Sequence, residues 1–87
     1  MNYPKIRNVK VLEDFFLEVT FENKITKVYD CKPLFSSTIF EKLKDLAFFM
    51  LAESNSGPYA VIWDDEIDLA ESEIWLNGKE KEERHVV

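Results

Sequence analysis

The chain has 87 residues, of which 46% are hydrophobic and 32% charged, and its formal net charge is −6. This length predicts one domain that buries roughly 60–65% of its unfolded surface, with aromatic residues supplying much of the core. The negative charge argues against a nucleic-acid partner, which requires clustered Lys and Arg, and against binding to an anionic membrane surface.

The cysteine content and the hydropathy pattern predict a cytoplasmic protein. Cys31 is the only cysteine and has no partner for an internal disulfide, which is typical of a reducing compartment. The first eight residues lack the apolar segment of a signal peptide. The longest apolar run, Leu46–Ala52, has seven residues and is too short to cross a bilayer.

The first half of the chain predicts an antiparallel meander of three strands. Ile6–Leu12, Phe16–Phe21 and Ile25–Asp30 are rich in β-branched and aromatic residues, and the second of these runs alternates apolar and polar side chains. Glu22–Lys24 forms the tight connection between the second and third strands. Asn23 is the residue of that turn expected to take a positive φ.

A short helix is expected after the third strand. Thr38 and Glu41 have the spacing of a capping box, in which each side chain caps the backbone of the first helical turn. Phe40, Leu43 and Ala47 follow at positions i, i+3 and i+7, so they fall on one helical face.

The remaining elements predicted are two strands and a C-terminal helix. Phe48–Glu53 is expected to be a fourth strand because it is aromatic and precedes a Ser-Asn-Ser-Gly-Pro breaker, and Tyr59–Trp63 a fifth. Asp68 suits the N-cap of a helix over Leu69–Leu76, which ends at Gly78.

These elements together predict an α+β fold. It consists of a small antiparallel meander sheet of about five strands, one short helix after the third strand and a short C-terminal helix. Residues 1–78 are expected to form a single domain, and residues 79–87 a charged, disordered tail.

The charges are distributed unevenly along the chain. The segment from Asp45 to Gly78 has eight acidic side chains and no Lys, Arg or His, whereas the remainder holds all eleven basic residues and nine acidic ones. One end of the domain is therefore expected to be strongly negative, which indicates a partner of opposite charge.

The carboxylates after the fifth strand do not predict a metal site. Asp64, Glu66 and Asp68 occupy positions 1, 3 and 5 of a calcium-binding loop. Leu69, however, stands where the loop needs Gly, and Trp75 where it needs a bidentate Glu. Solvation and the helix dipole account for these carboxylates without a metal or an acid–base role.

No catalytic or cofactor-binding residue is predicted. Cys31 has no second cysteine near it, and the only histidine, His85, lies in the tail, so Cys31 is expected to be a small buried residue. The sequence also has no phosphate-binding glycine motif and no zinc-ligand spacing.

The two tryptophans have different expected roles. Trp63 ends an apolar strand and is expected in the core. Trp75 is equally compatible with the core and with an exposed interface, since Ile74 and Leu76 beside it also require burial.

Several segments in a fixed order resemble a bacterial family of small domains, domain-of-unknown-function family 2442. They begin with P-K-I-R-N-V-K from Pro4, L-E-V-T-F-E-N from Leu17 and V-Y-D from Val28, and continue with P-L-F, F-E-K-L-K-D, V-I-W-D-D-E-I-D-L-A and L-N-G. The resemblance covers about residues 3–78 and is most specific from Tyr59 to Gly78.

The resemblance implies an α+β fold like that of the N-terminal domain of a Nitrosomonas structural-genomics protein, and no enzyme activity. Relatives that consist of this domain alone are often encoded beside a small basic, toxin-like protein, which implies an antitoxin-like role. Other relatives carry a C-terminal helix-turn-helix domain; none is expected in this chain, and neither is direct DNA binding. Lys24 stands where the family frequently has Gly, so the local turn is expected to differ.

The leading hypothesis is therefore a non-catalytic protein-binding module for a small basic protein. Its binding residues are expected to be Asp64, Asp65, Glu66 and Asp68, with Trp75 as the apolar anchor. The alternative is a structural domain that self-associates as a homodimer, in which the acidic face serves only solubility. An enzyme with carboxylates of raised pKa in a cleft is the weakest reading.

Overall fold

The computed structural model describes residues 2–81, and its main sheet has four antiparallel strands in the order β1-β2-β3-β6. These strands are β1 (Ile6–Val11), β2 (Phe16–Phe21), β3 (Thr26–Asp30) and β6 (Lys79–Glu80). A second sheet pairs β4 (Ala60–Ile62) with β5 (Asp68–Ala70), also antiparallel. The predicted α+β class is confirmed, although the strands divide between two sheets instead of forming one.

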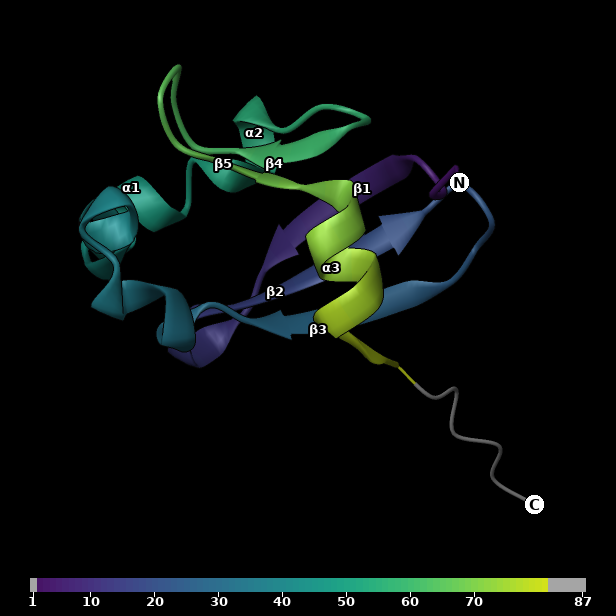
Figure 1. The fold of residues 1–87 in the computed structure, drawn as a ribbon, viewed down its shortest axis with the longest axis horizontal. Helices are drawn as coiled ribbons and strands as arrows, with labels where there is room; N and C mark the ends of the chain where they lie inside the picture. The colour runs from purple at the N-terminus through teal and green to yellow at the C-terminus, as the bar shows by residue number, and fades with distance from the viewer. Residues whose placement is uncertain (1, 82–87) are drawn as a thin grey trace.

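Short helical segments connect the strands. The 3₁₀ segments are η1 (Glu13–Phe15), η2 (Lys32–Ser36) and η3 (Thr38–Lys44), and the α-helices are α1 (Leu46–Phe49), α2 (Ala52–Asn55) and α3 (Glu71–Asn77). Figure 1 shows α3 crossing β2 and β3, with the β4–β5 hairpin above it and α1 beyond one end of the sheet. No helix among residues 2–81 is long and apolar enough to cross a membrane.

The core lies between the main sheet and the elements that cover one of its faces. Strand alternation directs Leu17, Val19 and Phe21 of β2 into this core, where all three are fully buried. Trp63 is also fully buried, as expected, and its Nε1–H donates a 3.0 Å hydrogen bond to the Phe49 carbonyl oxygen. That bond satisfies the one polar atom of the indole ring.

Both hairpins of the main sheet use residues with positive φ. In the β1–β2 turn, Asp14 and Phe15 have φ of 60° and 62°. In the β2–β3 turn the left-handed residue is Lys24, with φ of 73°, whereas Asn23 was expected to take that conformation. Asn23 instead uses its side-chain Oδ1 to accept the N–H of Ile25, at 3.1 Å.

The expected strand over Phe48–Glu53 is wrong, because this segment lies in α1, the following turn and α2. The Oδ1 atom of Asp45 accepts the N–H of Ala47 at 3.0 Å and caps α1. Phe49 and Ala52 are both buried, three residues apart, as on one face of a helix. The helix expected after the third strand is present as η3, without a side-chain cap from the capping box.

Two further expectations near the C-terminus need correction. Asp68 is not an N-cap: it belongs to β5, where it pairs with Ile62, and α3 begins only at Glu71. The ordered domain does not end at Gly78, because Lys79 and Glu80 pair with β3 and the N–H of Lys81 donates to the Thr26 carbonyl. The rest of the predicted tail, residues 82–87, lies outside the described residues.

Candidate functional site

The acidic turn joins β4 to β5 and comprises residues 64–66. Asp64 holds it in shape, since its Oδ1 accepts the backbone N–H groups of Glu66 at 2.9 Å and Ile67 at 2.8 Å. Trp63 and Ile67 close the base of the turn with a 3.0 Å backbone hydrogen bond and are both buried. The turn therefore presents Asp65 and Glu66 to solvent on a fixed backbone.

Half of the carboxylates in the acidic segment have a structural role. Asp45 caps α1, and Glu53 accepts the N–H of Val11 at 2.7 Å on the outer edge of β1. Asp64 shapes the turn, and Glu73 accepts the Tyr29 hydroxyl. The other four side chains make no hydrogen bond or ion pair with residues 2–81; they are Asp65, Glu66, Asp68 and Glu71.

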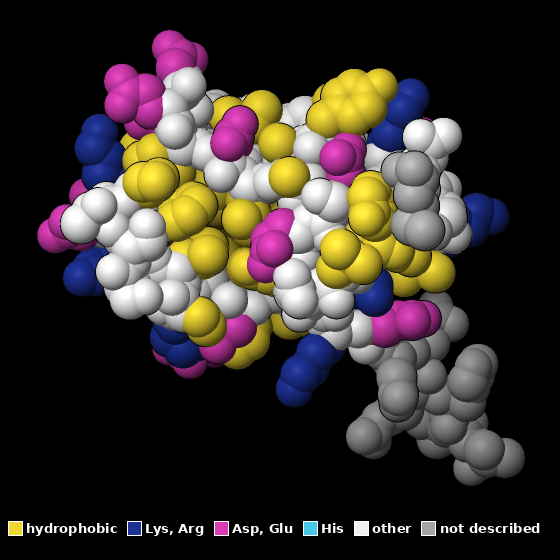
Figure 2. Space-filling model, in the orientation of Figure 1, with side chains coloured by type: hydrophobic (Ala, Val, Ile, Leu, Met, Phe, Trp, Pro, Cys, Tyr) yellow, Lys and Arg dark blue, Asp and Glu magenta, His cyan; other side chains and the backbone are white. Residues whose placement is uncertain are grey.

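A groove of about 420 Å³ runs beside the acidic turn, between the turn and η3. Its walls include Glu66 and Ile67 on one side and Ile39 and Lys42 on the other. Ile39 is 65% exposed, so its side chain is available for contact at the edge of the groove. Figure 2 shows Asp and Glu side chains at the tip of the hairpin, Lys or Arg side chains close by, and apolar side chains in the hollow beneath.

Trp75 is not part of the same surface as the acidic turn. Its ring packs edge-on against Phe21, with centroids 5.2 Å apart, and the Nζ of Lys27 lies 4.7 Å from the ring centroid. These contacts place Trp75 over the β2–β3 end of the sheet, and Figure 1 shows α3 well separated from the β4–β5 turn. Of the three adjacent apolar residues in α3, Leu76 faces outward, at 64% exposed.

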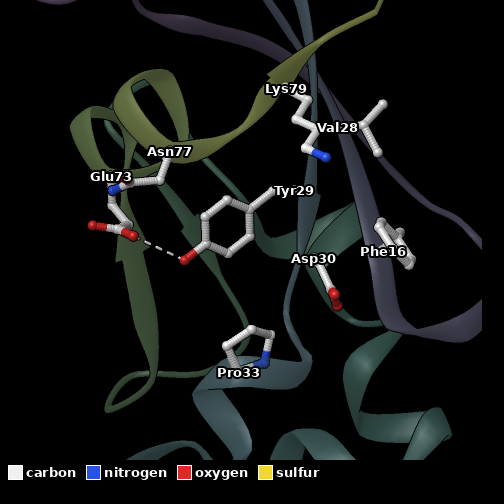
Figure 3. A pocket seen from close by; sticks show the side chains of 8 residues that line it. All are labelled: Phe16, Val28, Tyr29, Asp30, Pro33, Glu73, Asn77 and Lys79. Carbon is white, nitrogen blue, oxygen red and sulfur yellow. Dashed lines mark hydrogen bonds between the residues drawn. The ribbon is translucent and has the colours of Figure 1, made fainter.

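A second groove of about 490 Å³ lies where α3 meets β3 (Figure 3). Glu73 and Asn77 project from α3 on one side, Pro33 closes one end, and the Tyr29 ring stands between them. The Tyr29 hydroxyl donates a 2.9 Å hydrogen bond to Glu73 Oε2. Phe16, Val28, Asp30 and Lys79 line the remainder.

Cys31 lies in the core, as the sequence predicted, and is fully buried. Burial, followed by the nearby Asp30 charge, raises the pKa of the Cys31 thiol to about 12. A thiol with this pKa remains protonated at neutral pH and is a poor nucleophile. No group of three or more His, Cys, Asp and Glu side chains within residues 2–81 is arranged to hold a metal ion.

The sequence model of the family described as "Protein of unknown function (DUF2442)" matches residues 6–80. The chain belongs to this family. The match confirms the resemblance found from the sequence, and its C-terminal limit coincides with the end of β6. No curated protein and no solved structure matches the chain.

Sequence reasoning identified the acidic turn but missed both grooves. The sequence does not single out Ile39, which adjoins Phe40 in a helical segment, because only the approach of η3 to Ile67 places it in the groove. The bond between Tyr29 and Glu73 joins residues 44 positions apart. No spacing rule connects such residues, although the pattern of α3 could have placed Glu73 and Asn77 on one face.

Proposed function

We propose that this DUF2442 domain is a non-catalytic protein-binding module that acts in the bacterial cytoplasm on a small basic protein. The observation that carries the proposal is the β4–β5 turn, which holds Asp65 and Glu66 exposed beside the groove at Ile39. Carboxylates on a fixed backbone lose little entropy on binding, and they attract a basic partner over several ångströms before contact.

Apolar contact in this surface comes from Ile39, because Trp75 is remote from the turn. A partner segment that places an apolar side chain against Ile39 and Ile67 brings its Lys or Arg side chains to Asp65 and Glu66. Lys42 on the opposite wall favours an acidic residue of the partner at that one position. Charge alternation of this kind selects one orientation of the partner.

An antitoxin-like role follows if the partner is an RNA-cleaving toxin. Such an enzyme presents a basic surface to phosphates, and the acidic turn can cover that surface. The resemblance to family members encoded beside small basic proteins supports this reading.

The test compares a charge-reversed variant with a matched control in pull-downs from the native organism. The test variant is Asp65→Lys with Glu66→Lys; Asp64 is retained because it shapes the turn. The control is Glu13→Lys with Glu22→Lys, two exposed carboxylates outside the acidic segment with the same total change in charge. We expect the wild type and the control to recover a small basic protein in equal amounts, and less of it as salt rises.

The test variant is expected to bind that protein at least about tenfold more weakly, which corresponds to about 1.4 kcal/mol. Ile39→Ala is expected to weaken binding with little change in its salt dependence, because it removes contact area and no charge. Equal recovery by both charge variants, or recovery of the bait alone, would overturn the proposal.

The alternative function is self-association as a homodimer. Four large hydrophobic side chains in the segment from η3 to α2 are more than two-fifths exposed, and a second copy could cover them; they are Ile39, Leu46, Met50 and Leu51. Sedimentation of the purified domain separates this alternative from the leading proposal.

A further inference from the structure

We propose that the groove between α3 and β3 is a binding site for a small planar organic cation of the amidinium or guanidinium class. It is separate from the acidic turn, so the inference stands whether or not the proposed partner exists. Its volume of about 490 Å³ falls within the range of roughly 300–1,000 Å³ that is usual for small-molecule sites.

Glu73 supplies the negative charge of this site. The Tyr29 hydroxyl fixes the carboxylate by donating to Oε2 at 2.9 Å, which leaves Oε1 and a second lone pair on Oε2 able to accept. No Lys or Arg among residues 2–81 lies within ion-pair distance of Glu73. A partly buried carboxylate held in place, with no cation beside it, is suited to a charge-assisted, two-point hydrogen bond from an amidinium.

The other charges along the groove do not compete for such a ligand. Asp30 is already paired with Lys32, whose Nζ lies 3.0 Å from its carboxylate. Lys79 extends toward Val28, on the far side of the Tyr29 ring from Glu73 (Figure 3). The cation is therefore attracted to the Glu73 side of the groove.

The apolar surface around Glu73 favours a flat ligand. Pro33 and Tyr29 line the groove together with Glu73, and Asn77 lines it one helical turn beyond Glu73. A planar group can lie against the two rings while its N–H groups donate to Glu73 and to the Asn77 side-chain oxygen.

Benzamidine is the probe, and benzoate, with the same ring and the opposite charge, is the control ligand. Backbone amide shifts in two-dimensional NMR report binding to the full chain. We expect benzamidine to shift Tyr29, Glu73 and Asn77 in a saturable manner and benzoate to leave them unchanged. Glu73→Gln keeps an acceptor for the Tyr29 hydroxyl while removing the charge, and is expected to weaken benzamidine binding about tenfold.

Two further variants keep the test decisive. Glu71→Gln makes the same charge change on the same helix outside this groove and is expected to alter the affinity less than about twofold. Asn77→Asp adds a carboxylate to the groove and is expected to tighten binding. Absence of shifts in the groove, equal shifts with benzoate, or equal weakening by Glu73→Gln and Glu71→Gln would each overturn the proposal.

Discussion

The side chain of Lys24 is attached to a backbone in a conformation that favours glycine. Its φ of 73° brings the Cβ atom close to its own carbonyl, which costs about 1–2 kcal/mol for an L-residue. Glycine avoids this clash but has more freedom to lose on folding, at about 0.5–1 kcal/mol. The steric cost is the larger of the two, so glycine is expected to be the more stable residue at this position.

Lys24→Gly is therefore expected to raise the free energy of unfolding by about 0.5 kcal/mol, measured by urea denaturation. Lys44→Gly is the matched control, since it removes the same charge from a residue with negative φ at the end of η3. The control is expected to lower stability by about 0.5–1 kcal/mol. A loss of stability in both variants would show that the Lys24 conformation is not strained.

Tyr29 links stability to pH. Burial, together with the hydrogen bond to Glu73, raises the pKa of the Tyr29 phenol well above its ordinary value. The unfolded chain therefore releases this proton at a lower pH than the folded protein. The stabilisation is present in full below about pH 10 and is lost as the pH rises further.

Tyr29→Phe removes both the hydrogen bond and the ionisable group. At neutral pH we expect it to destabilise the protein by about 1 kcal/mol, because the ring remains and one hydrogen bond is lost. The difference in stability between the variant and the wild type is expected to narrow above about pH 10, because only the wild type has the Tyr29 contribution to lose. Tyr59→Phe, at a position 60% exposed, serves as the control, and a constant gap across this pH range would contradict the linkage.

Local sequence patterns predicted which side chains are buried more accurately than they predicted which side chains form the candidate binding surface. Burial of Trp63 and Cys31 follows from apolar strands and a lone thiol, which are local properties. The role of Trp75 depends on whether Phe21 and Lys27 reach it across the sheet, and that is a tertiary property. Asp65 and Glu66 are exposed, as the sequence predicted, whereas Asp64 is half-buried and bonded to the turn backbone. The sequence did not identify Ile39 as the apolar group beside them.

At the scale of elements, the junction between α3 and β6 depends on the absence of a side chain at Gly78. A Cβ atom there would lie 2.6 Å from the Ile74 carbonyl oxygen and 3.1 Å from Lys27 Cβ. Both neighbours belong to elements that are packed in place, so the helix end or the strand pair must shift to accept a methyl group. Gly78 thus allows the chain to leave the helix and enter the sheet at once.

Gly78→Ala is expected to lower the free energy of unfolding by about 1–3 kcal/mol, as seen for overpacked sites. Gly57→Ala is the comparison, because its Cβ would meet only Ile62 Cδ1, at 4.0 Å. That variant is expected to be neutral or to gain up to about 1 kcal/mol through the unfolded state. Urea denaturation of the two variants measures both free energies. Equal effects would mean that the junction between α3 and β6 shifts to accept the methyl group at little cost, contrary to this prediction.

The ends of strands and helices were predictable where a residue pattern typical of one element extends over the whole segment. The meander over β1, β2 and β3 was predicted within a residue or two, because all three runs are rich in β-branched and aromatic residues and β2 alternates over its whole length. The run Phe48–Glu53 is too short for periodicity to distinguish a strand from a helix, and the Asp45 cap settled it as helix. Asp68 fits the sequence pattern of a helix N-cap. In the structure, however, its backbone is part of β5, which pairs with β4 at Ile62.

At the scale of the molecule, the folded chain brings charges of both signs closer than the sequence suggests. The acidic segment contains no basic residue, yet η3 places Lys42 across the groove from Glu66. The surface is therefore negative at the turn and carries both signs of charge beside it. Such a pattern favours a partner with a matching arrangement of charges, whereas a uniformly negative surface would favour any basic protein. The net charge of −6 also makes two copies of the chain repel each other.

The whole domain is expected to sediment as a monomer of 10.3 kDa at low salt, because identical acidic turns repel each other when two copies approach. Raising the salt to about 1 M shortens the screening length from about 10 Å at 0.1 M to about 3 Å and removes most of this repulsion. Exposed hydrophobic side chains, among them Leu46 and Met50, then favour association, and we expect them to give only a weak, salt-promoted dimer. Sedimentation velocity at the two salt concentrations measures this directly. A stable dimer at low salt would contradict the expectation and favour the homodimer as the function of the domain.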